Sequence, residues 1–239
     1  MHMWKFAIFT VSILFTCIVD ATPSFASDQG AYDQKKVIKI AQLVIKTQIL
    51  NDPDPNQTYD QLVAEMVADP DLKAKIKRYR DAFPKQGIAN YLREMNSKGL
   101  NIQEKKQMLA VIDEEIQQTS TLFKSCRALN EIQVIHDQLL NIKIRCQVPK
   151  VSSEKINAFQ QQLETLSRED AVQFKIEYLR LKQQFLAQAN VVSFDSLLWI
   201  DLEDLPIYRA AIERGDGFPN RVIDQRDQAL TPYKSAPPK

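Results

Sequence analysis

Apolar residues recur at intervals of three or four along most of this chain, the spacing that gathers side chains on one face of an α-helix. The clearest run lies within residues 101–126, where Asn101 followed by Glu104 also forms a capping box. Its predicted buried face consists of Leu109, Ile112, Ile116, Thr119, Phe123 and Cys126. The pattern predicts a long amphipathic helix whose buried face ends at Cys126.

The same spacing, interrupted by capping residues and prolines, predicts helices along most of the remaining chain. We expect them to begin near residues 32, 58, 70, 86, 152, 167 and 205. Only five glycines are present, whereas hairpin-rich folds and phosphate-binding loops use many. The sequence therefore predicts an all-α protein, an irregular bundle of about 8–10 helices.

Residues 126–148 fit more than one structure. Apolar residues between 131 and 145 fit the period of a helix, but from Leu140 to Val148 every second residue is apolar, as in a strand. A turn near 135–138 would bring Cys126 opposite Cys146. We expect a short β-hairpin or a helical hairpin at 126–148 closed by a disulfide, with a continuous helix over 131–145 as the alternative.

The amino terminus has the pattern of a secretory signal peptide. A basic residue precedes an apolar run from Phe6 to Val19, and small residues lead up to Ala26. The run is shorter than the about 20 apolar residues that cross a bilayer. We expect cleavage of residues 1–26, with Ala21 as the alternative cleavage site. The exported chain would be periplasmic or secreted, without stable membrane insertion.

Removal of the signal peptide would take away Cys17 and leave Cys126 and Cys146. An oxidising compartment favours the pairing of two such cysteines. A zinc site would need closely spaced ligands such as CxxC, and a cysteine nucleophile would need a free thiol. We therefore expect a disulfide between Cys126 and Cys146, and neither a metal nor a cofactor.

The predicted helices form one long stretch of core-forming sequence. Residues 27–228 are expected to form a single helical domain, with two small lobes divided near 98–101 as the alternative. The chain ends in TPYKSAPPK, which has no apolar periodicity. We expect residues 229–239 to be a disordered tail.

The charge balance and the missing motifs narrow the classes of function. The chain carries 31 Lys and Arg against 30 Asp and Glu, a net charge of +1, whereas nucleic-acid-binding proteins neutralise many phosphates. The sequence has no GxSxG, HExxH, P-loop or GxGxxG motif, and His136 is the single histidine outside the predicted signal peptide. We expect no nucleic-acid partner, and the sequence favours a binding protein over an enzyme.

Two groups of side chains are candidates for contact with a partner. An aromatic and acidic group consists of Phe194, Trp199, Asp201, Glu203, Asp204 and Tyr208. A weaker basic patch consists of Lys73, Lys77 and Arg80, which the solvated face of an amphipathic helix also explains. We expect an exported helical protein that binds another protein, as an inhibitor, immunity-type factor, chaperone or envelope accessory factor. The alternative is a small periplasmic enzyme or ligand-binding protein with a pocket between helices.

Expression of the full-length chain with its own amino terminus tests the expected export. The intact mass of the exported protein should correspond to a chain that begins at Ser27, because signal peptidase cleaves after a small residue. Mass spectrometry of the periplasmic or extracellular fraction provides the measurement. A mass that retains residues 1–26, or a lipid attached to Cys17, would contradict the prediction.

Overall fold

The computed structural model describes residues 33–67, part of 70–77, and residues 88–136, 139–201 and 218–231. The predicted signal peptide and the helix expected to begin near residue 205 lie outside this part of the chain. No helix in the described part is long and apolar enough to span a bilayer.

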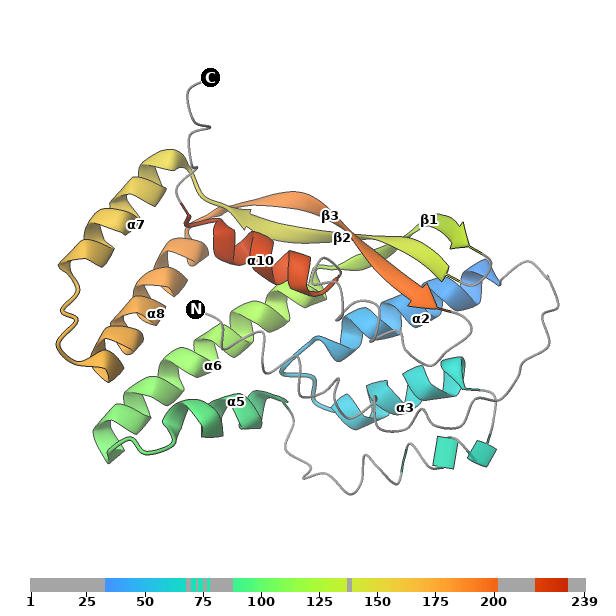
Figure 1. The fold of residues 1–239 in the computed structure, drawn as a ribbon, viewed down its shortest axis with the longest axis horizontal. Helices are drawn as coiled ribbons and strands as arrows, with labels where there is room; N and C mark the ends of the chain where they lie inside the picture. The colour runs from blue at the N-terminus through green and yellow to red at the C-terminus, as the bar shows by residue number, and fades with distance from the viewer. Residues whose placement is uncertain are drawn as a thin grey trace.

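Helices and strands alternate in blocks along the described chain (Figure 1). The first block is helical and contains α2 (Gln34–Thr47), α3 (Pro55–Met66), α5 (Ile88–Ser97) and α6 (Ile102–Lys124). The hairpin strands β1 (Arg127–His136) and β2 (Leu139–Lys150) follow. The remaining elements are α7 (Ser153–Thr165), α8 (Ala171–Ala187), β3 (Asn190–Asp201) and α10 (Asn220–Gln228).

The all-α prediction is wrong, because the three strands form an antiparallel sheet in the order β1-β2-β3. Of the structures considered for residues 126–148, the β-hairpin is the one present. The third strand was missed. Its residues alternate between the two faces of the sheet with a period of two. The acidic and aromatic residues of the same stretch obscure that period in the sequence.

The hairpin begins in the register that pairing of the two cysteines imposes and then shifts. Arg127 pairs with Arg145, one residue from the disulfide on each strand. Beyond a register shift, Ile132 pairs with Ile142, and a second shift follows Val134. Extra residues on one strand of a pair are the mark of a β-bulge. In contrast, β2 and β3 pair without a shift over their full lengths.

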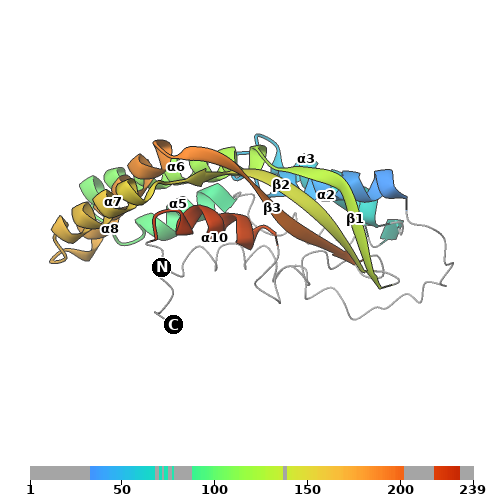
Figure 2. The same cartoon turned by 90° about the horizontal axis from the view of Figure 1, so that it is seen from above.

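One face of the sheet packs against the hydrophobic core. From 140 to 148 the even-numbered residues of β2 are at most 1% exposed, and they are Leu140, Ile142, Ile144, Cys146 and Val148. They pack with apolar residues of α2, of the end of α6 and of α10. Figure 1 shows these three helices on the same side of the sheet, and Figure 2 shows α7 and α8 beyond one end of the strands.

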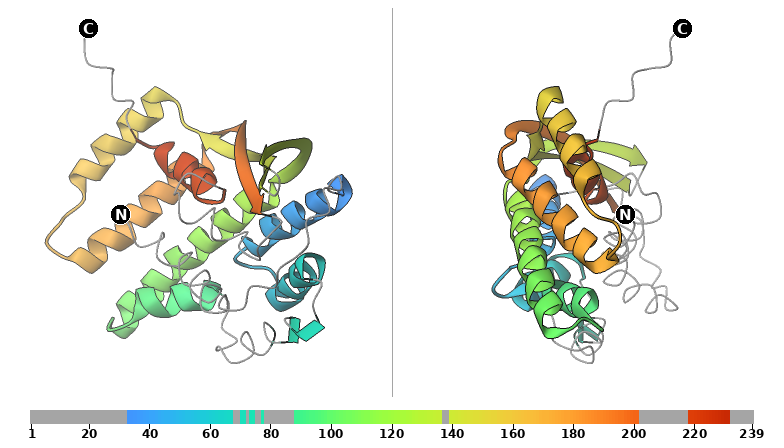
Figure 3. Two further views of the ribbon diagram at one scale, coloured as in Figure 1. Left: turned by 45° about the vertical axis from the view of Figure 1, so that its right-hand side comes forward. Right: turned by 90° about the vertical axis from the view of Figure 1, so that its left-hand side faces the viewer.

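Two further apolar clusters hold the helices together away from the sheet. One joins α5, α6 and α8, and the other joins α7 and α8 with Leu230, which is buried although it belongs to the predicted tail. Figure 3 shows α5 packed along the part of α6 that is farther from the sheet. The long helix α6 therefore contributes to the sheet core at one end and to the helical layer at the other. The division into two lobes near 98–101 stays a prediction.

The capping residues explain where several helices begin. The predicted capping box of α6 is confirmed: Glu104 donates its backbone N–H to the Asn101 side chain at 2.9 Å, and the Asn101 N–H donates to the Glu104 carboxylate at 3.0 Å. The helix expected to begin at Thr58 instead begins at Pro55, capped by Asp54. Proline is favoured in the first turn because it has no N–H to leave unpaired.

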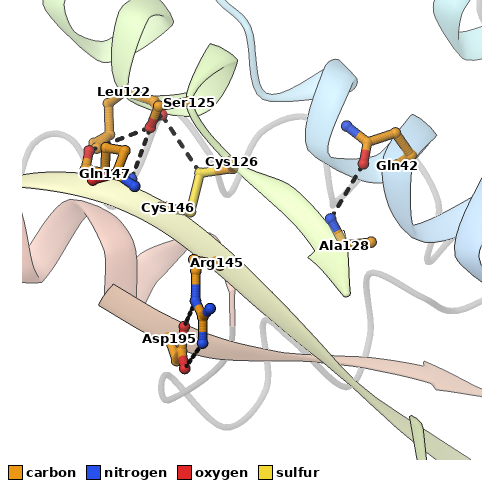
Figure 4. Close-up of a disulfide and its surroundings, with 9 residues drawn as sticks. All are labelled: Gln42, Leu122, Ser125, Cys126, Ala128, Arg145, Cys146, Gln147 and Asp195. Atoms are coloured by element: carbon orange, nitrogen blue, oxygen red, sulfur yellow. Dashed lines mark hydrogen bonds and ion pairs between the residues drawn. A yellow bond between two sulfur atoms is a disulfide. The ribbon is translucent and has the colours of Figure 1, made fainter. Parts of the chain in front are cut away.

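The predicted disulfide between Cys126 and Cys146 is present, with the two Cα atoms 4.0 Å apart. Both residues are buried, and Cys126 directly follows the last turn of α6. Nearby, the Gln147 backbone N–H donates to Ser125 Oγ at 3.0 Å. Figure 4 shows the disulfide and Ser125 on one side of β2, with Arg145 and Asp195 on the other. The disulfide therefore joins the end of α6 to the central strand.

Reduction of the disulfide should lower the melting temperature by several degrees and leave the helical circular dichroism in place. The closed loop restricts the unfolded chain, and for a sequence separation of 20 this contributes about 3 kcal/mol. The double variant Cys126→Ala, Cys146→Ala is the control, since reductant should not lower its melting temperature further. Two reactive thiols in the native exported protein would contradict the account.

Candidate functional site

The outer face of the sheet is the surface opposite the core. Because side chains alternate along a strand, the odd-numbered residues of β2 and β3 point away from the buried side. The described helices that contact the sheet pack against its inner face through the apolar cluster given above. On the outer face, Gln147, Ser193 and Asp195 are exposed, whereas Asn141 is buried. This outer face is thus largely accessible among the residues that the structure describes.

Four charged residues form an ion cluster at the centre of the outer face. Arg145 holds Asp195 with two hydrogen bonds, from Nε at 2.7 Å and from a terminal nitrogen at 2.9 Å. Lys143 Nζ lies 3.2 Å from Asp195 Oδ2 and 2.9 Å from Glu131 Oε2. A paired guanidinium and carboxylate of this kind combine charge with fixed geometry. The ion cluster therefore links all three strands.

The ion cluster changes the pKa of Lys143, Arg145 and Asp195. Hydrogen bonding from Arg145 lowers the pKa of Asp195 from 3.8 to about 2 against the opposing effect of burial. The hydrogen bonds to Glu131 and Asp195 raise the pKa of Lys143, and the hydrogen bond to Asp195 raises the pKa of Arg145. Lys143, Arg145 and Asp195 are consequently charged throughout the neutral pH range.

Apolar side chains of β3 border the ion cluster. Leu197 lies opposite Lys143 and is 37% exposed, and Trp199 lies opposite the buried Asn141 and is half-buried. At the other end of the strand, Val191 is 65% exposed. Tryptophan and arginine are enriched at the centres of protein interfaces, where apolar area and paired charges occur together. The outer face likewise combines a tryptophan and other apolar side chains with a paired arginine.

The structure separates the aromatic and acidic residues that the sequence grouped as a partner surface. Phe194 is half-buried on the inner face against the core, whereas Trp199 lies on the outer face. An odd separation along a strand places two residues on opposite faces. Asp201 is the last residue of β3, and Glu203, Asp204 and Tyr208 lie outside the described residues.

The predicted basic patch is described only in part. Lys73 is half-buried and Lys77 is exposed, while Arg80 lies outside the described residues. Within the described ranges, no group of three His, Cys, Asp or Glu side chains is placed to hold a metal ion.

Sequence reasoning missed Lys143, Arg145 and Asp195 as members of one surface. Lys143 and Arg145 occupy the polar positions of the alternating segment 140–148, which is a usable signal for an exposed sheet face. Asp195 joins them only through pairing between β2 and β3, which two helices separate along the chain. That pairing has no local signature in the sequence.

A second charged group lies buried between α6, α8 and α10, and we call it the interhelical ion network. Glu115 Oε1 lies 2.8 Å from Arg226 Nη2 and 3.4 Å from Lys182 Nζ. Asp227 Oδ1 lies 2.8 Å from Arg226 and 3.0 Å from Lys182. Arg226 also donates to Thr119 Oγ1 at 2.7 Å. Two acids and two bases therefore meet where three helices join.

Burial and mutual attraction compete in the interhelical ion network. Burial alone would raise the pKa of Asp227, but attraction to Arg226 and Lys182 outweighs it and lowers that pKa. Burial would likewise lower the pKa of Arg226, but attraction to Glu115 and Asp227 raises it. Burial, with smaller effects of Asp227 and Glu115, raises the pKa of Tyr178. All of these charges partner one another, which favours a structural role.

The sequence contains a signal for this network. Glu115 precedes Ile116 and lies four residues before Thr119, on the predicted buried face of α6, where a charge is unusual. Lys182 lies four residues after Tyr178, on the apolar side of α8. A charge within an apolar face indicates either a buried partner or a functional group. The partners Arg226 and Asp227 lie on a helix that the sequence did not predict.

Comparisons with protein-family models, with curated proteins and with solved structures find no match. The function must therefore be argued from the surfaces of this chain.

Removal of the Glu115 carboxylate should destabilise the protein by about 3–5 kcal/mol, because Glu115→Ala leaves buried Arg226 without one of its anions. Glu65→Ala is the control, since Glu65 pairs with the exposed Lys39 at 2.6 Å and such a pair contributes about 1 kcal/mol or less. Denaturant unfolding of both variants gives the two free energies. Equal losses would show that the buried network does not hold α10 in place.

Proposed function

We propose that this chain is an exported protein that acts by binding another protein through the outer face of its sheet. The single observation that carries the proposal is the exposed Leu197, which lies beside the half-buried Trp199 and the ion cluster around Arg145 and Asp195. A sheet face that only meets water is usually polar along its whole length.

The geometry of the ion cluster suits a partner surface of mixed character. Arg145 and Asp195 already pair with each other, so their ionic attraction is present before a partner arrives. A partner would cover apolar area at Leu197 and Trp199 and bond to the remaining acceptor and donor positions of the cluster. Pre-formed geometry of this kind lowers the entropic cost of association.

Export is supported by the covalent chemistry of the chain. The disulfide between Cys126 and Cys146 is of the kind that persists in oxidising compartments and is rare in the cytosol. The amino-terminal sequence has the length and pattern of a cleaved signal peptide. Both observations support a periplasmic or secreted protein, whose partner would be an envelope or extracellular protein.

Leu197→Lys should abolish capture of the partner from envelope extract or culture medium, because it places a charge in the apolar part of the interface. Tyr91→Lys is the matched control: Tyr91 is also 37% exposed but lies on α5, away from the sheet. Affinity capture followed by mass spectrometry compares the two variants with the parent protein at equal loading.

Three results would contradict this function. Capture that survives Leu197→Lys would exclude the outer face as the binding surface. Loss of capture in both variants would indicate an effect that does not depend on this face. Clear thermal stabilisation by a small metabolite, with no captured protein, would favour the alternative of a ligand-binding protein or enzyme.

A further inference from the structure

The two edges of the sheet differ in how far other residues cover their backbone N–H and C=O groups. The edge at β1 carries two register shifts, and α2 covers part of it: Ala128 donates its backbone N–H to Gln42 Oε1 at 3.2 Å, and Gln34 donates to the Asn130 carbonyl at 3.5 Å. Bulges and covering side chains are common ways of preventing an edge strand from pairing further. The edge at β1 is therefore protected.

Among the residues that the structure describes, none of these protections is found at the β3 edge between Asn190 and Ser196. The strand pairs with β2 in one continuous register, contains no proline or lysine, and carries one charged residue there, Asp195, already bound by Arg145. A regular edge without a free charge is a template for another strand. Among the described residues, the first backbone group that covers this edge is the Phe218 N–H, which donates to the Leu197 carbonyl at 3.1 Å.

Strand geometry determines which residues of β3 face the open edge. In an antiparallel pair, residues that exchange both hydrogen bonds alternate with residues whose N–H and C=O point away. The Cα separation of 4.0 Å between Cys126 and Cys146 is close to the about 4.5 Å of a non-hydrogen-bonded pair. Cys146 therefore points its backbone groups toward β3, and so do the other even-numbered residues of β2.

It follows that the odd-numbered residues of β3 direct their N–H and C=O groups to the open edge. The bond between Phe218 and the Leu197 carbonyl agrees with this parity, and so does Pro149, which lies opposite Val191 and has no N–H to donate to β3. Val191, Ser193 and Asp195 thus present three pairs of backbone groups that no other described residue outside β3 bonds.

The inner side of the same edge is incompletely covered. Val192 and Phe194 are half-buried against the sheet core, whereas Ser196 and Leu198, farther along β3, are buried. An added strand would supply neighbours for both Val192 and Phe194. The edge therefore offers backbone hydrogen bonds and apolar contact at the same place.

We propose that two copies of this chain pair through this edge, with β3 of one copy antiparallel to β3 of the other and a two-fold axis at Ser193. In this register Val191 faces Asp195 of the second copy, and Ser193 faces Ser193. All three open positions are used, and pairing stops before Leu197, where Phe218 lies. Each of these pairs exchanges two hydrogen bonds, and the two sheets become one of six strands.

The side chains of this register are self-complementary. On the inner side, Val192 faces Phe194 of the second copy twice, a β-branched and aromatic pair that stabilises antiparallel strands. On the outer side, the two serines meet at the axis and no like charges face each other. This self-complementarity favours a second copy over an unrelated strand as the occupant. The dimer is independent of the proposed partner and would place two outer faces side by side.

Two substitutions at one exposed position test both the dimer and its register. Because Val191 faces Asp195 of the second copy, Val191→Glu opposes like charges and Val191→Lys opposes unlike charges, at two symmetric places. The dissociation constants of the two variants should differ by about tenfold or more, with the lysine variant tighter. Sedimentation of the exported chain over a range of concentrations provides the measurement, and the parent protein should be a dimer at high concentration.

Substitutions at the axis provide a second test. The Ser193 N–H points to the open edge, so Ser193→Pro removes no bond to β2 and should give a folded monomer, whereas Ser193→Ala should remain a dimer. Both variants lose the hydrogen bond from Gln147 to Ser193 Oγ, which makes them matched. If Ser193→Pro loses its circular dichroism, it is unfolded, and the comparison of the two Val191 variants tests the dimer instead. A monomeric parent protein, equal dissociation constants for the Val191 variants, or a folded Ser193→Pro that dimerises normally would overturn the proposal.

Discussion

The alternation of side chains along β2 is the constraint on which the rest of the structure depends. Its even-numbered residues from Leu140 to Val148 are almost completely buried, and its odd-numbered residues face the opposite side. A sheet of three strands covered by helices on one face leaves its second face, and any edge that no helix or loop covers, to solvent. The candidate binding surface and the open edge are both direct consequences of this arrangement.

Two further links support the helices that the apolar cluster packs against that sheet. The disulfide joins the end of α6 to the middle of the hairpin, and the interhelical ion network joins α10 to α6 and α8. The first restricts the unfolded chain, while the second gives the buried helix junction a specific partner for each charge. The stable layer behind the sheet is what makes its outer face a fixed surface.

The sequence predicted local features better than distant ones. The capping box of α6, the disulfide and the starting register of the hairpin follow from residues close in sequence, and the structure has all three. The strand β3 was missed because two helices separate it in sequence from its partner β2. Its stability depends on pairing with that distant strand, and the local sequence does not reveal this pairing. The ion pairs of Asp195 with Arg145 and of Glu115 with Arg226 were missed for the same reason, because the partners lie far apart in sequence.

Amide hydrogen exchange along β3, resolved residue by residue by NMR, tests the account most directly. In dilute solution the N–H groups of Val192, Phe194 and Ser196 should exchange slowly because they bond to β2, and those of Val191, Ser193 and Asp195 should exchange rapidly. At concentrations that favour the dimer, the second group should become protected as well. Equal exchange rates for the two groups in dilute solution, or no added protection on concentration, would contradict an open β3 edge that pairs with a second copy.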